Sequence, residues 1–388
     1  MNKIPHFASN LCMNIRWMCI LGLAVAVSRV ADASDAGTSS AQFLKLGIGP
    51  RAIAMGEAQV AVADDVYATY WNPAGLARLP TKEAGFVQNQ YLQSISQLFA
   101  AFAYPTDKLG TFAGSFSYLN YGRFQGYDAG GSPIGSIGAN DLDVAASYAT
   151  SLFYDRSLGS SLSFGVTGKW IQEKLDTVSA KAYAMDGGVL FKPGLRWGGI
   201  LEGWKAGATI RNLGTELKYD TESFPLPRSL DAGISYTGNI MREGVTWALD
   251  VHQPNDGSRS FGTGVEVWTL QTFVLRAGYT SRGDIGNGLR VGAGIRFKTV
   301  QVDYAYASAK DLGGTNYIGL TVRFKQVSAD PVFLSQKHYD KGMELFRRRR
   351  FTEALVEFNK SLELDPQHPD SLKMMKQTYE QIKILTPE

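Results

Sequence analysis

The sequence predicts an all-β transmembrane barrel of about fourteen antiparallel strands, preceded by a segment of small residues and followed by a small all-α tail. Segments of alternating apolar and polar residues, each about 9 to 13 residues long, recur from residue 83 to residue 324. An apolar export signal precedes them, and charged residues with helical periodicity follow them. No later stretch holds an apolar helix of spanning length, so a chain that enters a membrane must do so as a closed barrel.

Residues 1–33 have the features of an export signal. Lys3 and Arg16 precede an apolar run from Trp17 to Val27, and the small residues Ala31 and Ala33 offer a cleavage site. The run is shorter than the roughly 20 apolar residues that a spanning helix needs. An uncleaved anchor helix is the alternative interpretation.

The cysteines and the charge exclude several classes of function. Cys12 and Cys19 both lie inside the signal, so the mature chain would carry neither a disulfide nor a thiol nucleophile. Arg16, Trp17 and Met18 before Cys19 do not fit a lipoprotein signal. The net charge of +3 with 19% charged residues gives no argument for nucleic acid as a partner.

Residues 34–82 are rich in glycine and in other small residues, which suits a backbone that turns sharply or approaches another backbone closely. Asp64 is placed to cap a short helix. Val66, Tyr67, Tyr70 and Trp71 fall on one side of that helix, and Pro73 would end it. A soluble surface helix is the alternative.

This segment resembles the N-terminal segment of the PorV/PorQ branch of FadL-type outer-membrane barrels. The residues that carry the resemblance are Arg51-Ala52, Met55-Gly56, Val62-Ala63-Asp64-Asp65 and Tyr70-Trp71-Asn72-Pro73-Ala74-Gly75-Leu76-Ala77. The resemblance implies a plug inside the barrel lumen, with Arg51, Met55, Gly56, Asp64, Asp65, Trp71, Asn72, Pro73 and Gly75 as its motif. Glu57 stands where this family often has a second glycine, so we expect the turn after Met55 to differ.

The predicted barrel covers residues 83–324 and ends in a strand with one apolar face, Ile318, Leu320, Val322 and Phe324. A terminal aromatic resembles the closing strand of outer-membrane barrels and places Phe324 at the periplasmic rim. The predicted strands are 83–91, 94–104, 111–121, 142–153, 162–174, 182–192, 202–212, 228–237, 244–252, 260–269, 272–280, 288–297, 300–309 and 315–324.

Orientation follows from the position of Phe324. The short connections at 105–110, 270–271 and 298–299 then become periplasmic turns, while 122–141, 214–227 and 255–259 become external loops. The glycine-rich segment Gly122 to Asp141 matches no phosphate-binding motif, and we interpret it as a mobile loop.

Alternation assigns the two faces of the last strands. The predicted outward residues are Val245, Trp247, Leu249, Val251, Leu289, Val291, Ala293, Ile295, Phe297, Val300, Val302, Tyr304 and Tyr306. The opposite face carries Asp250, His252, Glu266, Arg276, Arg290, Arg296, Gln301, Asp303 and Arg323. A charge on the lipid face costs about 2–4 kcal/mol at mid-depth, so these residues are predicted to point into the lumen. Because the charges are of both signs, they predict a cross-bonded interior that holds the plug, rather than an ion-selective pore.

Asp250 and His252 lie two residues apart on one face, which raises the alternative of a hydrolytic site. No serine nucleophile or second acidic pair accompanies them in a motif, so we expect no catalysis. His6, His338 and His368 lack metal-ligand spacing, and neither a metal nor a cofactor is expected.

Beyond a linker at 325–334, residues 335–388 are predicted to form a helical tail. The tail matches the spacing of one tetratricopeptide repeat, although Ser361 stands where the repeat prefers alanine. A further helix, 370–384, would cover its exposed face. A single repeat cannot bury its own core, so the tail is expected to dock on the barrel rim, pair with another copy or complete a partner's array. The repeat residues are Gly342, Leu345, Phe351, Ala354, Phe358, Ser361 and Pro366.

The basic run Arg347 to Arg350 lies at the turn between the two helices of the repeat. It is either a solvated turn or a contact with anionic lipid or an acidic partner.

The resemblance implies two classes of function. PorV-like relatives are accessory subunits of type IX secretion that receive cargo proteins, whereas FadL-like relatives are uptake channels for hydrophobic small molecules. The tail favours the first class, a non-enzymatic component that docks periplasmic or secreted proteins. The expected location is the cell outer membrane with the tail in the periplasm. The expected partners are membrane lipid and proteins bound through the tail, with a hydrophobic small molecule under the second class.

Overall fold

The computed structural model describes residues 37–92, 95–106, 109–155, 160–193, 203–240, 243–282, 286–308, 313–324, 331–366 and 368–385. The predicted export signal and both cysteines lie outside these residues, as does most of the predicted linker.

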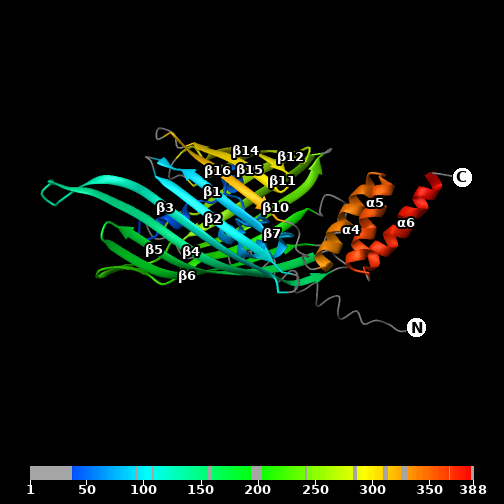
Figure 1. The fold of residues 1–388 in the computed structure, drawn as a ribbon, viewed down its shortest axis with the longest axis horizontal. Coiled ribbons are helices and arrows are strands. Elements are labelled where there is room, and N and C mark those ends of the chain that lie inside the picture. The colour runs from blue at the N-terminus through cyan, green and yellow to red at the C-terminus, as the bar shows by residue number, and fades with distance from the viewer. Residues whose placement is uncertain are drawn as a thin grey trace.

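The fold is a closed antiparallel barrel of fourteen strands, as the sequence predicts (Figure 1). Each strand pairs with its neighbour along the chain, and β1 pairs with β16 to close the barrel. The barrel strands are β1 (Glu83–Gln90), β2 (Ser96–Pro105), β3 (Thr111–Tyr127), β4 (Pro133–Asp155), β5 (Ser160–Leu175), β6 (Val178–Lys192), β7 (Trp204–Gly214), β10 (Ser229–Ile240), β11 (Glu243–Pro254), β12 (Ser260–Thr269), β13 (Phe273–Thr280), β14 (Leu289–Phe297), β15 (Val300–Ser308) and β16 (Gly314–Arg323).

The two faces of the wall follow the predicted alternation. Leu289, Val291 and Ile295 on β14 are exposed on the outer surface, whereas Glu266, Arg276 and Asp303 on neighbouring strands are buried. A strand projects successive side chains to opposite faces, so the outer surface is an apolar band and the lumen receives the charges.

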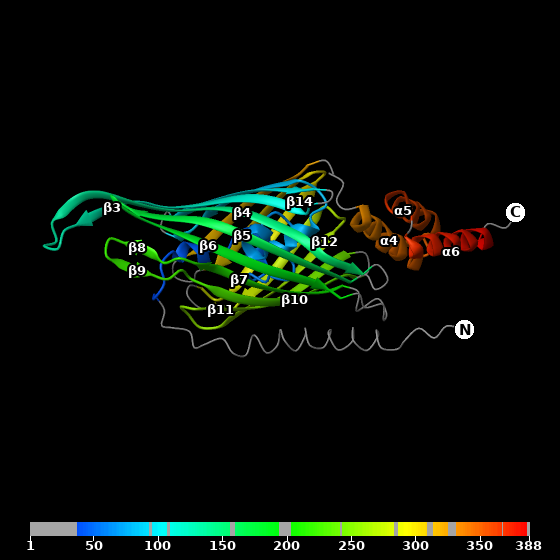
Figure 2. The ribbon, with the colours of Figure 1, turned by 90° about the horizontal axis from the view of Figure 1, so that it is seen from below.

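The segment 122–141 is a correction to the sequence interpretation, which made it a mobile loop. β3 continues to Tyr127 and β4 begins at Pro133, so the two strands form a long hairpin that extends beyond the barrel wall (Figure 2). The pairing passes a bulge between Asn120 and Arg123 and resumes with Arg123 opposite Gly138. Glycines and polar residues in this segment obscure the alternation of apolar and polar side chains. The backbone pairing of β3 with β4 nevertheless continues through it.

The predicted external loop 214–227 also contains regular structure. β8 (Leu217–Tyr219) and β9 (Glu222–Phe224) pair as a short separate hairpin at the same end of the barrel as the long one (Figure 2).

The plug lies inside the barrel, as Figure 1 shows in blue. It consists of short helices with irregular connections: η1 (Gln42–Lys45), α2 (Pro50–Ala54), α3 (Ala68–Trp71) and η2 (Pro73–Arg78). Contrary to the prediction, Asp64 does not cap α3, which begins after Tyr67 without a side-chain cap. Asp65 accepts from the Tyr67 N–H at 3.0 Å, and Asp64 instead pairs with Arg51. Electrostatic attraction to a buried arginine takes the place of the local cap.

The tail forms three helices, α4 (Pro331–Arg347), α5 (Phe351–Leu364) and α6 (Pro369–Leu385). Gly342 lets α4 approach α5, because a Cβ there would lie 2.6 Å from the Phe358 ring. The tail lies at the end of the barrel opposite the long hairpin (Figure 1), where Asp340 is 3.8 Å from Lys192 and Glu344 accepts from Asn239 at 3.3 Å. No helix among the described residues is long and apolar enough to cross a membrane.

Candidate functional site at the plug and barrel wall

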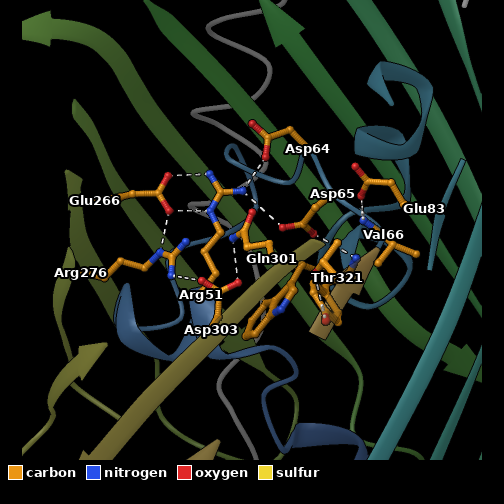
Figure 3. Close-up of polar contacts among 12 residues, drawn as sticks. Arg51, Asp64, Asp65, Val66, Glu83, Glu266, Arg276, Gln301, Asp303 and Thr321 are labelled. Atoms are coloured by element: carbon orange, nitrogen blue, oxygen red, sulfur yellow. Dashed lines mark hydrogen bonds and ion pairs between the residues drawn. The ribbon is translucent and has the colours of Figure 1, made fainter. Parts of the chain in front are cut away.

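Arg51 lies at the centre of an ion-pair network that joins the plug to the wall (Figure 3). Its Nε and Nη2 donate to the two carboxylate oxygens of Glu266 on β12, both at 2.9 Å. Its Nη1 donates to Asp64 at 2.6 Å and to Asp65 at 3.3 Å. One guanidinium, with its planar fork of donors, therefore connects three carboxylates from two parts of the chain.

The network continues along the wall from Glu266. Arg276 on β13 donates from Nε to Glu266 and from Nη1 to Asp303 on β15, both at 2.6 Å. Asp303 in turn accepts from the side-chain amide of Gln301 at 2.7 Å. Strands β12, β13 and β15 of the wall thus share one set of buried hydrogen bonds.

Arg323 on β16 carries the network across the seam where the barrel closes. It donates from Nη1 to Gln301 at 2.9 Å and from Nε to Glu83 on β1 at 2.8 Å. Glu83 also contacts the plug, because its carboxylate accepts a hydrogen bond from the Val66 N–H at 3.2 Å. The interior polar groups therefore couple three contacts: plug to wall, strand to strand, and first strand to last.

Arg296 and Arg290 extend the set of lumen charges in different ways. Arg296 donates from Nε and Nη2 to Gln301 at 2.9 and 2.8 Å, and its guanidinium lies 4.1 Å from the centroid of a Trp268 ring. Arg290 stands apart from the network: in the described chain its hydrogen bonds go to the carbonyl oxygens of Leu289 and Ser308.

Glycines allow the plug backbone to lie directly against the wall. A Cβ on Gly264 would lie 2.4 Å from the Met55 carbonyl oxygen, and Cβ atoms on Gly262 and Gly278 would lie 2.1 and 2.3 Å from Gly56 backbone atoms. Gly56 itself has φ +68°, and a Cβ there would lie 2.4 Å from the Tyr279 carbonyl oxygen. A side chain at any of these positions would separate the two backbones.

The turn after Met55 contains an unusual second residue. Glu57 also has φ +68°, so a glutamate occupies the left-handed region where glycine is favoured. Its carboxylate pairs with Arg282 at 2.9 Å. The residue that adopts this costly backbone conformation is thus also held to the wall side by an ion pair.

The Trp71-Asn72-Pro73 part of the motif connects separate segments of the plug by hydrogen bonds. Trp71 donates from Nε1 to the Ile48 carbonyl oxygen at 2.7 Å. Asn72 donates to the Val60 carbonyl oxygen at 2.8 Å and to that of Val189, on the β6 wall, at 3.1 Å. It also accepts from the Ala74 N–H, which caps η2. Farther along, a Cβ on Gly75 would lie 2.2 Å from the Ala63 carbonyl oxygen.

Asp250 and His252 do not pair with each other. Asp250 accepts from the N–H groups of Gln59 and Val60, each at 2.6 Å, and so holds the plug backbone. His252 Nδ1 instead lies 3.1 Å from Asp231 on β10. The pair that suggested a hydrolytic site therefore serves two separate contacts.

Sequence reasoning missed Glu83, Arg211 and Asp231. Arg211 on β7 donates to Asp231 at 2.8 Å, and its guanidinium lies 5.2 Å from the ring centroid of Tyr70 in the plug. The same inward and outward alternation, applied to β1, β7 and β10, would have placed all three in the lumen.

The cavity beside the plug motif is small. A cavity of about 10 Å³ lies beside Trp71, between α2 and α3, and is lined by Ile48, Ala52 and Tyr67 among others. That volume is at the lower limit for a single water molecule. This cavity beside Trp71 is thus too small for an organic ligand.

Comparisons with known proteins agree with this architecture. The family model described as type IX secretion system protein PorV matches residues 30–239, more than half of the 388-residue chain. No curated protein matches the chain.

Among solved structures, the chain is similar to the CymD monoaromatic hydrocarbon channel, with a TM-score of 0.51 and 13% identity over 72% of this chain and 98% of that one. It is also similar to the Pseudomonas putida toluene transporter TodX, with a TM-score of 0.47 and 12% identity over 71% and 96% of the two chains. At this identity the likeness to CymD shows the barrel fold and not the ligand. The family model and the plugged fourteen-strand barrel together show that the chain belongs to the PorV family of type IX secretion proteins, components of the outer membrane.

Proposed function

We propose that this outer-membrane secretion component works without catalysis, as a closed barrel that docks protein partners at both of its ends. The observation that carries the proposal is the plug, which is joined to the wall by a continuous network from Arg51 to Glu83. A lumen fixed in this way favours a scaffold over a conduit. The residues that suggested hydrolysis, Asp250 and His252, hold structural contacts instead.

The long hairpin of β3 and β4 supports docking at one end. It extends past the barrel wall (Figure 2) and exposes Phe124, Tyr127 and Ile134, with 47%, 62% and 60% of their surfaces accessible. Large apolar side chains clustered on an exposed element mark interaction sites. We infer that the hairpin contacts another protein outside the cell.

The tail supports docking at the other end. The short turns predicted at 270–271 and 298–299 lie at that end, and short turns face the periplasm in outer-membrane barrels. We therefore infer that the tail is periplasmic and that it is a repeat of the tetratricopeptide kind. Its outer face leaves Val356, Leu372 and Tyr379 exposed and surrounds a groove of about 660 Å³ between α5 and α6. Such a surface is suited to a protein partner.

The test compares the full-length protein with a protein lacking residues 329–388. Partner capture from the periplasm should be lost, while the barrel keeps its heat-modifiable migration because strand pairing closes at Arg323. A matched variant, Gly342→Val, should lose capture too, since its side chain would clash with Phe358 without shortening the chain. Capture that is unchanged in both proteins contradicts docking through the tail.

Uptake of a hydrophobic small molecule is the second candidate, favoured by the fold shared with the monoaromatic hydrocarbon channel CymD. The same proteins are tested for uptake of a labelled aromatic hydrocarbon. Strong uptake with and without the tail, and no partner in either case, would replace docking by uptake as the function.

A further inference from the structure

Residues 39–46, here called the stopper, fill the outer end of the lumen like a bound peptide. Phe43 and Leu44 on η1 are 3% and 4% exposed. They pack in an apolar cluster together with Ala41 of the stopper. The rest of the cluster comes from other parts of the chain: Leu119 on β3, Ile171 on β5, Ala180, Ala182 and Ala184 on β6, Leu217 on β8, and Leu226. The stopper therefore occupies a chamber that other parts of the chain build around it.

A single carboxylate holds the polar side of the stopper. Asp256, in the loop between β11 and β12, accepts through the same oxygen from Ser39, from Gln42 at 2.8 Å and from Lys45 at 2.7 Å. Burial alone would raise the pKa of Asp256, but these hydrogen bonds outweigh it and lower the pKa below its usual value. The carboxylate is thus matched to a cationic ligand group.

The backbone of the stopper is recognised as well. The Ser40 N–H donates to the Pro225 carbonyl oxygen at 3.0 Å, and the Ser40 hydroxyl lies 3.2 Å from the same oxygen. Backbone contacts, two adjacent apolar side chains in a chamber and a cation on a carboxylate are the elements by which proteins recognise peptide segments.

The connection between the stopper and the rest of the plug contains glycines. Gly47 and Gly49 flank Ile48, and Gly49 has φ +91°. Trp71 anchors Ile48 from the plug side, so a rotation at this connection leaves the Arg51 network in place. At the other end, Ala41 adopts φ +50°, a conformation that costs energy in a residue with a Cβ and that release would relieve.

We propose that the stopper is an internal ligand of a peptide-binding site, and that the site takes a segment of a partner protein with two adjacent large apolar residues followed directly by a cation. Residues Phe43, Leu44 and Lys45 display this pattern in the occupied state. The use of this site to receive a secreted protein rests on the proposed function. The existence of the site does not depend on that function.

The test empties the chamber and offers a peptide in its place. The triple variant Phe43→Ala, Leu44→Ala, Lys45→Ala removes the two apolar side chains and the cation of the stopper, and it keeps Asp256 and the chamber lining. A fluorescent synthetic peptide with the sequence of residues 37–46 should bind the purified variant at least about tenfold more tightly than wild type, whose site is already filled. A peptide with serine in place of both apolar residues should not bind.

Control variants distinguish specific peptide binding at this site from nonspecific binding and from misfolding. The double variant Phe124→Ala, Tyr127→Ala removes aromatic area from the exposed hairpin and should bind the peptide no better than wild type. In the emptied background, Asp256→Asn should weaken peptide binding about tenfold, the effect of losing one charge-assisted contact, while Asp176→Asn in the exposed turn after β5 should not. Heat-modifiable migration verifies folding of each variant.

Failure to bind the peptide by the folded, emptied variant would overturn the proposal. So would equal binding of the apolar and serine peptides, or binding that does not depend on Asp256. Because these measurements use purified protein without secretion partners, they stay informative even when partner capture through the tail fails.

Discussion

At the scale of single residues, the plug depends on side chains with few substitutes. Arg51 contacts Glu266, Asp64 and Asp65 together, and a lysine would offer one point charge in place of a planar fork. A buried charge is strongly destabilising when it loses its partner. The network therefore specifies one position for the plug.

We predict that Arg51→Met destabilises the folded barrel by about 3–5 kcal/mol, because it leaves the carboxylates of Asp64 and Asp65 without their main cation. The readout is the temperature at which the purified protein loses its compact electrophoretic migration. Arg123→Met, a change of the same size on the exposed hairpin, should leave that temperature unchanged. Equal stability of both variants would show that the network does not hold the plug.

A second residue prediction concerns the backbone contact at Gly264. Gly264→Ala would place a methyl group 2.4 Å from the Met55 carbonyl oxygen and should cost about 1–3 kcal/mol by displacing the plug. Gly168→Ala is the control, since no atom lies within 4 Å of its Cβ position. The measurement is the rate at which an added protease cleaves the plug. Faster cleavage in the control than in Gly264→Ala would contradict the close contact.

At the scale of elements, the strands differ in what they do beyond crossing the membrane. β12 to β16 are short and carry the lumen network, whereas β3 and β4 continue into the exposed hairpin. The tail helices form a separate packing unit in which Glu357 on α5 bonds His338 and Lys341 on α4, at 2.7 and 3.0 Å. Its stability should therefore respond to conditions that leave the barrel intact.

The tail is predicted to lose stability in acid. Burial alone would raise the pKa of Glu357, but the hydrogen bonds from His338 and Lys341 outweigh it and lower the pKa to about 2 from an ordinary value of 4.5. A carboxylate whose pKa is lower in the folded than in the unfolded protein stabilises the fold at pH values above its ordinary pKa. This contribution is lost as the pH falls from about 4.5 towards 2. With solvent screening, the expected loss is about 1 kcal/mol.

Circular dichroism of the helical signal in full-length protein tests this prediction, with melts at about pH 6 and about pH 3. Glu357→Gln should reduce the dependence on pH, and Glu380→Gln, on the exposed face of α6, should not. A pH dependence that is identical in all three proteins would exclude Glu357 as its source.

At the scale of the whole molecule, closure of the barrel joins residues far apart in sequence. β1 pairs with β16 from Glu83 opposite Arg323 to Gln90 opposite Asn316. Phe324 follows directly, donating its N–H to the Lys82 carbonyl oxygen at 2.8 Å, and its ring packs edge to face against Phe102 with centroids 6.1 Å apart.

Phe324→Ala is predicted to reduce the amount of assembled barrel several-fold, since it removes the aromatic contact at the closing seam. Quantification of heat-modifiable protein in isolated outer membranes gives the result. Phe297→Ala, at the end of β14, removes another exposed aromatic away from the seam and is the control. Normal assembly of Phe324→Ala would show that the seam does not depend on this residue.

The sequence by itself determined the fold class, the number of barrel strands and the inward direction of the charges in the last strands. These features follow from local periodicity, because a strand inverts its side chains at every residue and lipid excludes charge from one face. The plug motif was also recognisable from its residues, although not its contacts.

Only the tertiary structure decided which charges meet. Arg51 and Glu266 are separated by 215 positions, and the pairing of Asp64 with Arg51 overrode the local capping expected of that aspartate. The length of the β3–β4 hairpin likewise depended on strand pairing across residues whose own alternation is weak. Long-range ion pairs and strand registers depend on where the barrel wall brings distant segments together, which no local pattern contains.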